Sequence, residues 1–167
     1  MSIAKRLVLI FSVLVCCAGC DRVSKSYAEA RLSQTQTLSF FAGAIRLQLA
    51  RNEGAFLGLG ASLSRPARQA IFRTGVACML LGLLAYALFF APGPWSVSAA
   101  SLILAGGASN LADRFVYDGY VLDFINLGAG PLRTGIFNLA DVAITAGVVM
   151  LLIGGRRAER QRQRNLP

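Results

Sequence analysis

The sequence predicts a mainly α, polytopic membrane protein, with four transmembrane helices, a small extracytoplasmic β-sheet and a short helix. Three observations predict this fold class. Hydrophobic residues make up 55% of the 167 residues and the mean hydropathy is +0.57. Charged residues make up only 15%, whereas soluble domains carry roughly a quarter. Several apolar runs also approach the length of ~20 residues that a membrane-spanning helix needs. We expect residues 1–167 to form a single domain.

The predicted spans cover about 5–27, 70–91, 95–113 and 135–155. In the first span, only fourteen apolar residues follow Arg6 before Asp21, so we expect the helix to continue beyond Asp21. Pro92-Gly93-Pro94 predicts a tight turn between the second and third spans. The fourth span is interrupted only by Asp141. Small residues within these spans, among them Gly75, Gly82, Gly106, Gly107 and Gly147, favour close helix packing.

The start of the chain also permits another interpretation. Lys5 and Arg6, the apolar run after them and the sequence CAGC before Asp21 are typical of a signal peptide with a lipidation site at Cys20. Cys17 stands where such a site usually carries leucine, and the sequence after it is again membrane-like. We therefore expect a retained first helix, and the sequence leaves open whether CAGC is ever processed.

Four spans would place both termini on one side of the membrane. Lys5, Arg6 and the arginine-rich tail 156–167 mark that side as cytoplasmic. The region of about 28–69 and the loop after the third span then face outwards. Arg65, Arg68 and Arg73 oppose this orientation, but the charges of the tail outweigh them. We predict a multi-pass protein of the bacterial cytoplasmic (inner) membrane.

The outward-facing region contains one strand signal. Ile45, Leu47 and Leu49 alternate with more polar residues, which predicts a half-exposed strand lying on the membrane surface. Glu53 is interpreted as a solvated turn residue. The glycine-containing loop that follows, with 58–62 as its centre, is a candidate lid over a site.

Several kinds of site are not expected. The chain has no histidine, which excludes Ser-His and Cys-His catalysis and the commonest zinc ligand. The four cysteines lie in apolar runs and are interpreted as small buried hydrophobic residues. We therefore expect no metal and no cofactor. The net charge of +9 is concentrated beside a span, so it indicates membrane topology and no nucleic-acid partner is expected.

Four of the eight acidic residues, Asp113, Asp118, Asp123 and Asp141, lie in or beside the apolar sequence from Gly106 to Gly147. An ionisable group at membrane depth is costly and persists mainly where it has a partner or a function. Asp118 is interpreted as a turn residue. Asp123 and Asp141 could meet near the outer interface, with Asp141 about six residues inside the last span. Two carboxyls in one low-dielectric site share a proton, so that one can act as a base on water.

Polar neighbours could hold these carboxylates in place. Asn110, Arg114 and Asn138 could donate hydrogen bonds to them, and Asn138 shares a helical face with Asp141. The alternative is a polar network that only holds the helices together. Asp21 and Lys25 are four residues apart and form either an ordinary surface pair or a brace at the mouth of a site. Spacing alone does not decide between these.

Five ordered motifs carry a family resemblance: Asp21-x-x-Ser24-Lys25, Asn52-x-Gly54-Ala55-Phe56, Gly107-Ala108-x-Asn110-Leu111-x-Asp113-Arg114, Val121-Leu122-Asp123-Phe124 and Phe137-Asn138-Leu139-Ala140-Asp141. The chain resembles the lipoprotein signal peptidases (signal peptidase II), a family of four-helix membrane aspartic peptidases, over roughly residues 5–157. The resemblance implies that the catalytic pair is Asp123 and Asp141. It implies a second set of residues that support the site or bind substrate: Asp21, Lys25, Asn52, Gly54, Asn110, Arg114, Asn138 and Ala140.

The implied reaction is cleavage of diacylglyceryl-modified prolipoproteins just before the lipidated cysteine, by a mechanism without a cofactor in which one aspartate activates water. The implied partners are these substrates and membrane lipid, and a monomer is expected. Arg22 departs from the family, which often carries glutamine there. A scaffold protein and a proton-coupled transporter using Asp141 are the alternatives, although the chain has no convincing internal repeat.

Overall fold

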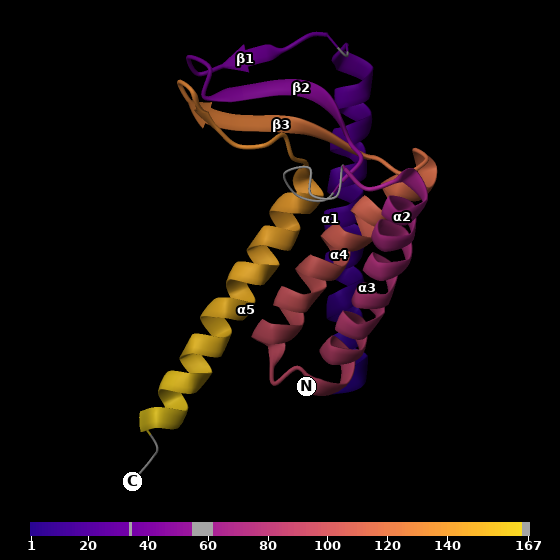
Figure 1. Cartoon of the computed structure of the whole chain (residues 1–167). Helices are drawn as coiled ribbons and strands as arrows, with labels where there is room; N and C mark the ends of the chain where they lie inside the picture. Colours follow the sequence, from indigo (N-terminus) through magenta and orange to yellow (C-terminus); the bar gives the residue numbers. More distant parts are fainter. Residues whose placement is uncertain (34, 55–61, 165–167) are drawn as a thin grey trace.

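The computed structural model describes residues 1–33, 35–54 and 62–164, which form a helical bundle with a small sheet at one end (Figure 1). The N-terminus and the end of the last helix lie at the opposite end of the bundle from the sheet. The helices are α1 (Ile3–Arg31), α4 (Pro94–Val116), α5 (Leu139–Arg164) and a continuous helical segment made of α2 (Arg65–Gln69), η2 (Ala70–Gly75), α3 (Val76–Ala85) and η3 (Tyr86–Phe90).

Three helices of the described part are long and apolar enough to cross a membrane: Ile3–Arg31, Pro66–Phe90 and Leu139–Arg156. The protein is therefore a multi-pass membrane protein. The predicted third span forms α4, but α4 is not among these three candidates. Its many serine, glycine and alanine residues and Asn110 make it less apolar than its neighbours. The crossing of the membrane by α4 stays a prediction.

Helix α4 is the centre of the bundle, and glycines bring its neighbours close. A Cβ atom on Gly106 would lie 2.3 Å from the carbonyl oxygen of Ala140 in α5, and one on Gly147 would lie 2.6 Å from that of Ala99. The expected role of small residues is confirmed at these positions. It is wrong for Gly75 and Gly82, whose added Cβ atoms would meet nothing within 4 Å.

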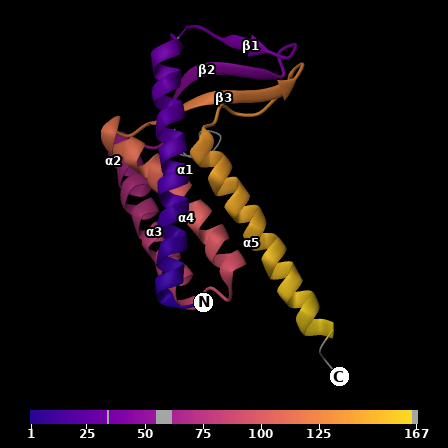
Figure 2. The ribbon, with the colours of Figure 1, turned by 180° about the vertical axis from the view of Figure 1, so that it is seen from behind.

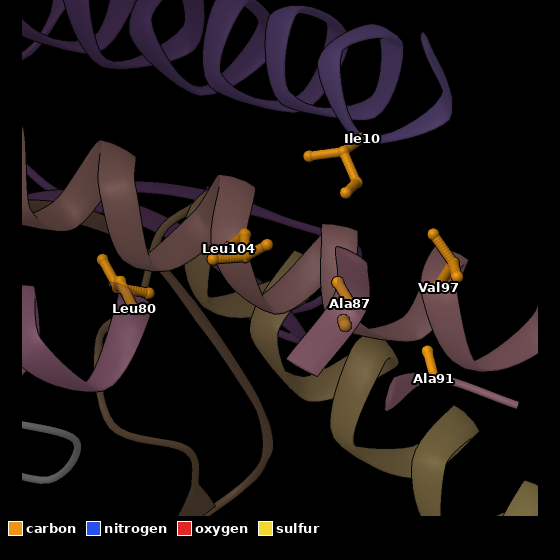
Figure 3. Close-up of a cluster of buried hydrophobic side chains, with 7 residues drawn as sticks. Ile10, Leu80, Ala87, Ala91, Val97 and Leu104 are labelled. Atoms are coloured by element: carbon orange, nitrogen blue, oxygen red, sulfur yellow. The ribbon is translucent and has the colours of Figure 1, made fainter. Parts of the chain in front are cut away.

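The hydrophobic core joins α1, α3, η3 and α4 (Figure 3). Its buried side chains are Ile10, Leu80, Ala87, Ala91, Val97, Ala100 and Leu104. Arg6 closes the same region at the end far from the sheet. Its Nη1 and Nη2 donate to the carbonyl oxygens of Ala87 and Ala91, each at 2.8 Å. The guanidinium thus satisfies carbonyls that a helix end leaves without an intrahelical partner.

The sheet is antiparallel in the order β1-β2-β3-β4, with β1 (Leu38–Phe40), β2 (Ile45–Asn52), β3 (Val121–Ala129) and β4 (Leu132–Arg133). The predicted strand is confirmed as β2. The end of α1 nearest the sheet stands upright at one end of strands β2 and β3 (Figure 2), where Ala28 and Leu32 pack with Phe124. This contact holds the sheet against the bundle.

Asp123 lies in the connection between α4 and α5, where it is part of β3, opposite Ala50 of β2. Two expectations about these elements are wrong. Helix α5 begins at Leu139, so Asp141 is in its first turn rather than six residues inside it. The cysteines are not buried, since Cys16, Cys20 and Cys78 are exposed and Cys17 is half-buried. Apolar sequence in a membrane protein can face lipid as readily as protein.

Candidate active site

The beginning of α5 fixes the position of Asp141. The backbone N–H of Asp141 donates to Oδ1 of Asn138 at 3.0 Å, and the backbone N–H of Asn138 donates to Oδ2 of Asp141 at 3.2 Å. This reciprocal pair has the form of a capping box, in which the N-cap residue and the third helical residue satisfy each other's free N–H groups. The Asp141 carboxylate is thereby held at the start of the helix, at its positive end.

Asp123 reaches the same place from β3. Its side chain is buried and accepts hydrogen bonds from Nδ2 of Asn52 at 2.9 Å and from Nδ2 of Asn138 at 2.6 Å. Burial raises the pKa of Asp123 to about 6, because a charged carboxylate loses hydration inside the protein. The two amide donors act in the opposite direction, and the nearby charge of Asp141 raises this pKa further.

Two asparagines connect the two carboxylates. Asn138 bonds both Asp123 and Asp141, and Asn110 of α4 donates from Nδ2 to Oδ1 of Asp141 at 2.9 Å. Oδ1 of Asn110 accepts from Nδ2 of Asn138 at 3.1 Å. The predicted donors Asn110 and Asn138 are confirmed. The structure thus brings Asp123, Asp141 and their amide partners into one connected group.

A buried ion group lies behind this cluster. Lys25 lies 2.6 Å from Asp21 and 2.8 Å from Asp113, and the side chains of Asp21 and Lys25 are 0% exposed. The surface-pair interpretation is therefore wrong. Asp21 also accepts from the backbone N–H of Ala140 at 2.9 Å and from Oγ of Ser109 at 2.6 Å. Helix α1 is in this way tied directly to the start of α5.

Asp113 and Ser109 belong to this group but were not among the predicted site residues. Asp113 also accepts from the backbone N–H of Leu122 at 3.3 Å, which fixes the start of β3. The position of Asp113, three residues after Asn110 on the same helical face, was a signal for it. Ser109 had no signal, because a serine in an apolar helix most often bonds its own backbone.

Arg114 and Gly54 support the site differently from the prediction. Arg114 does not donate to a carboxylate in the described region. It donates to the carbonyl oxygens of Gly54 at 2.8 Å and Asn110 at 3.1 Å, and its guanidinium lies 5.3 Å from the ring centre of Phe72. The backbone N–H of Gly54 donates to Oδ1 of Asn52 at 3.1 Å. Arg114 therefore holds the turn that orients Asn52.

The remaining polar candidates lie outside the cluster. The side chain of Glu53 is 57% exposed and pairs with Arg68, and that of Asp118 is 72% exposed, 3.6 Å from Arg73. Asp118 has a φ of +52°, which confirms it as a turn residue. Within the candidate lid, residues 55–61 are outside the described part of the chain.

Together, the fold and the site define a class of protein: a multi-pass membrane protein with two connected carboxylates, one buried and one half-buried, suited to acid–base chemistry on water. The described residues contain no group of three or more His, Cys, Asp or Glu side chains that could hold a metal ion. Two aspartates that share a site in this way form the catalytic arrangement typical of an aspartic peptidase.

Comparison with known proteins gives the family. The sequence model of the signal peptidase (SPase) II family matches residues 13–155. The lipoprotein signal peptidase of Syntrophomonas wolfei is 34% identical over 144 residues, covering 84% of this chain and 90% of that protein. That of Bifidobacterium longum strain DJO10A is 33% identical over 139 residues, covering 80% and 70%. The chain belongs to the signal peptidase II family of membrane aspartic peptidases, which confirms the resemblance.

Solved structures agree on the fold. A bacterial membrane enzyme determined at 2.3 Å superposes with a TM-score of 0.76 at 24% identity, covering 92% of this chain and 88% of that one. A second bacterial membrane enzyme, determined at 1.9 Å, gives a TM-score of 0.72 at 23% identity, covering 90% and 92%. The architecture of helices and sheet is thus shared with membrane enzymes.

Proposed function

We propose that this enzyme removes the signal peptide from diacylglyceryl-modified prolipoproteins by cleaving just before the lipidated cysteine, and that Asp123 and Asp141 are its catalytic pair. Family membership supports the reaction. The observation that carries the assignment of the pair is that Asn138 bonds both carboxylates, that of Asp123 from the sheet through Nδ2 and that of Asp141 from α5 through its backbone N–H.

The chemistry follows from a pair that holds one proton. The ionised carboxylate accepts a proton from water as the water attacks the scissile carbonyl, while the protonated carboxyl donates its proton to the carbonyl oxygen. The carboxyl that took the proton from water then gives it to the leaving amine as the C–N bond breaks. The other carboxylate takes back a hydroxyl proton from the tetrahedral intermediate, so the pair again holds one proton. The raised pKa of Asp123 supports a pair that keeps one proton up to about pH 6. The amides of Asn52, Asn110 and Asn138 hold the carboxylates in place during these transfers.

The proposed topology has four spans, with α4 as the third in chain order, and places both termini in the cytoplasm. It is supported by the position of the N-terminus and the end of α5 at the same end of the bundle (Figure 1) and by the basic residues of both segments. The sheet and the aspartate pair then lie at the outer face of the bacterial inner membrane. A lipidated substrate could reach the pair laterally from the bilayer, with the enzyme acting as a monomer.

The experiment is cleavage of a lipidated prolipoprotein by the purified protein in detergent. Asp123→Asn and Asp141→Asn are each expected to lose at least about 1,000-fold in turnover while remaining folded by thermal unfolding, because neither amide can exchange the proton. Asp118→Asn, at an exposed turn, is the matched control and retains full activity. Cleavage that survives either of the first two changes removes that aspartate from the pair. Loss of stability with normal cleavage would support the scaffold alternative for that residue.

A further inference from the structure

Lys25 is buried beneath the proposed catalytic pair and uses all three of its N–H donors. Nζ lies 2.6 Å from Oδ2 of Asp21 and 2.8 Å from Oδ2 of Asp113, and it donates to Oδ1 of Asn110 at 3.1 Å. The ammonium group has three donors and no acceptor. It therefore has no further hydrogen bond to offer to a substrate.

The contact with Asn110 fixes the orientation of an amide. An asparagine side chain presents an acceptor on one side and two donors on the other. With Oδ1 toward Lys25, Nδ2 of Asn110 is directed at Oδ1 of Asp141, 2.9 Å away. The reverse orientation would place the NH₂ group against the ammonium and the oxygen against the carboxylate, so both contacts would be repulsive. Asn138 favours the same orientation, since its Nδ2 donates to Oδ1 of Asn110.

We propose that Lys25 is a positioning residue that acts through Asn110, keeping an amide donor directed at the Asp141 carboxylate. This rests on the proposed function of Asp141 as one of the catalytic pair. Asp21 and Asp113 hold the ammonium in place, and Arg22, 3.7 Å from Asp113, lies on the far side of that carboxylate. Lys25 thus contributes to the reaction without touching substrate.

The test is a double-mutant cycle on kcat/KM for lipidated prolipoprotein cleavage, with Lys25→Met, Asn110→Ala and the double variant. Each single variant is expected to lose on the order of 10- to 100-fold, the range for hydrogen bonds to charged groups. The kcat/KM of the double variant is expected to be no lower than that of the less active single variant, because both changes interrupt the same connection. A double loss equal to the product of the single losses would overturn the proposal.

Arg22→Gln is the matched control, because Arg22 also faces Asp113 but has no bond to Asn110. When Arg22→Gln is combined with Asn110→Ala, the fold-loss in kcat/KM is expected to equal the product of the two single losses. If Arg22 and Asn110 were coupled as strongly as Lys25 and Asn110, the coupling would be a general response of the ion group. That result would overturn the specific role of Lys25. Thermal unfolding of each variant separates lost folding from lost turnover.

If Lys25→Met does not fold, the Asn110→Asp variant tests the proposal in its place. The new carboxylate still accepts from Lys25 but offers no donor to Asp141, so activity is expected to fall as far as in Asn110→Ala and the acid limb of the pH–rate profile to move to higher pH. An Asn110→Asp enzyme with wild-type activity and profile would overturn the proposal. An active Asp141→Asn enzyme would instead overturn the proposed function.

Discussion

Asn138 and Asp141 bond each other in both directions, each side chain accepting the backbone N–H of the other residue at 3.0 and 3.2 Å. The same asparagine donates to Asp123 at 2.6 Å. A structural cap and a contact within the proposed active site are therefore made by one side chain. The two roles can be separated, because capping needs only an acceptor whereas the bond to Asp123 needs a donor with the reach of asparagine.

Asn138→Ala is expected to lose both roles: about 1 kcal/mol of stability from the cap and at least about tenfold in cleavage from the lost bond to Asp123. Asn138→Ser keeps a capping oxygen on a shorter side chain. We expect it to restore the thermal midpoint to near that of the wild type while cleavage stays low. Thermal unfolding and cleavage rates measure the two effects. Full activity in Asn138→Ser would contradict a need for the bond to Asp123.

Stability is expected to depend on pH through Asp123. Its pKa of about 6 lies above the ordinary 3.8, so the folded protein holds this proton more tightly than the unfolded chain. The contribution of Asp123 to stability is therefore fully present below about pH 4 and is lost as the pH rises through about 6. The shift corresponds to a cost of about 3 kcal/mol above that pH.

Asp123→Asn removes this cost, although one amide donor then faces the new NH₂ group at a loss of about 1 kcal/mol. We expect the variant to be more stable than the wild type by about 2 kcal/mol at about pH 8, with no gain at about pH 4. Thermal unfolding across this range is the measurement, and Asp118→Asn, at an exposed turn, is the control. A variant that is no more stable at about pH 8 would contradict the buried, costly charge.

The contact between α4 and α5 at Gly106 is expected to tolerate no side chain. Gly106→Ala would place a methyl group 2.3 Å from the carbonyl oxygen of Ala140, and overpacking of this kind costs about 1–3 kcal/mol. Because Asp141 follows Ala140, we also expect slower cleavage. Gly82→Ala is the matched control, with nothing within 4 Å of the added Cβ, and should be neutral or slightly stabilising in its helix. Equal behaviour of the two variants would contradict the close contact.

Local patterns in the sequence were sufficient for much of the fold. Apolar runs predicted the helices and alternation predicted β2, because both depend on residues close in the chain. β3 was missed because Val121, Leu122, Asp123 and Phe124 are all buried, so no alternation marks them. Its partner is β2, more than 70 residues earlier, with Asp123 opposite Ala50. No local signal could have indicated that pairing.

The candidate site was predicted in composition but not in its contacts. Spacing indicated that Asn138 could meet Asp141, since residues three apart share a helical face. The same rule could not distinguish a surface pair from a buried one for Asp21 and Lys25, because burial depends on what α4 and α5 bring against them. Arg114 was expected to face a carboxylate, but the carbonyl of Gly54 lies within its reach instead.

The bond between Asp21 and Ala140 joins the first helix to the last, and this has a consequence for biosynthesis. A ribosome must translate residue 141 before the second aspartate exists, and α5 must then enter the bundle before Asp21 can accept its N–H. With Asp123 and Asp141 as the proposed catalytic pair, a chain whose α5 has not joined the bundle has no complete pair. The proposal therefore implies that peptidase activity arises only after α5 is in place, so that an unfinished chain poses no proteolytic hazard to the membrane in which it is made.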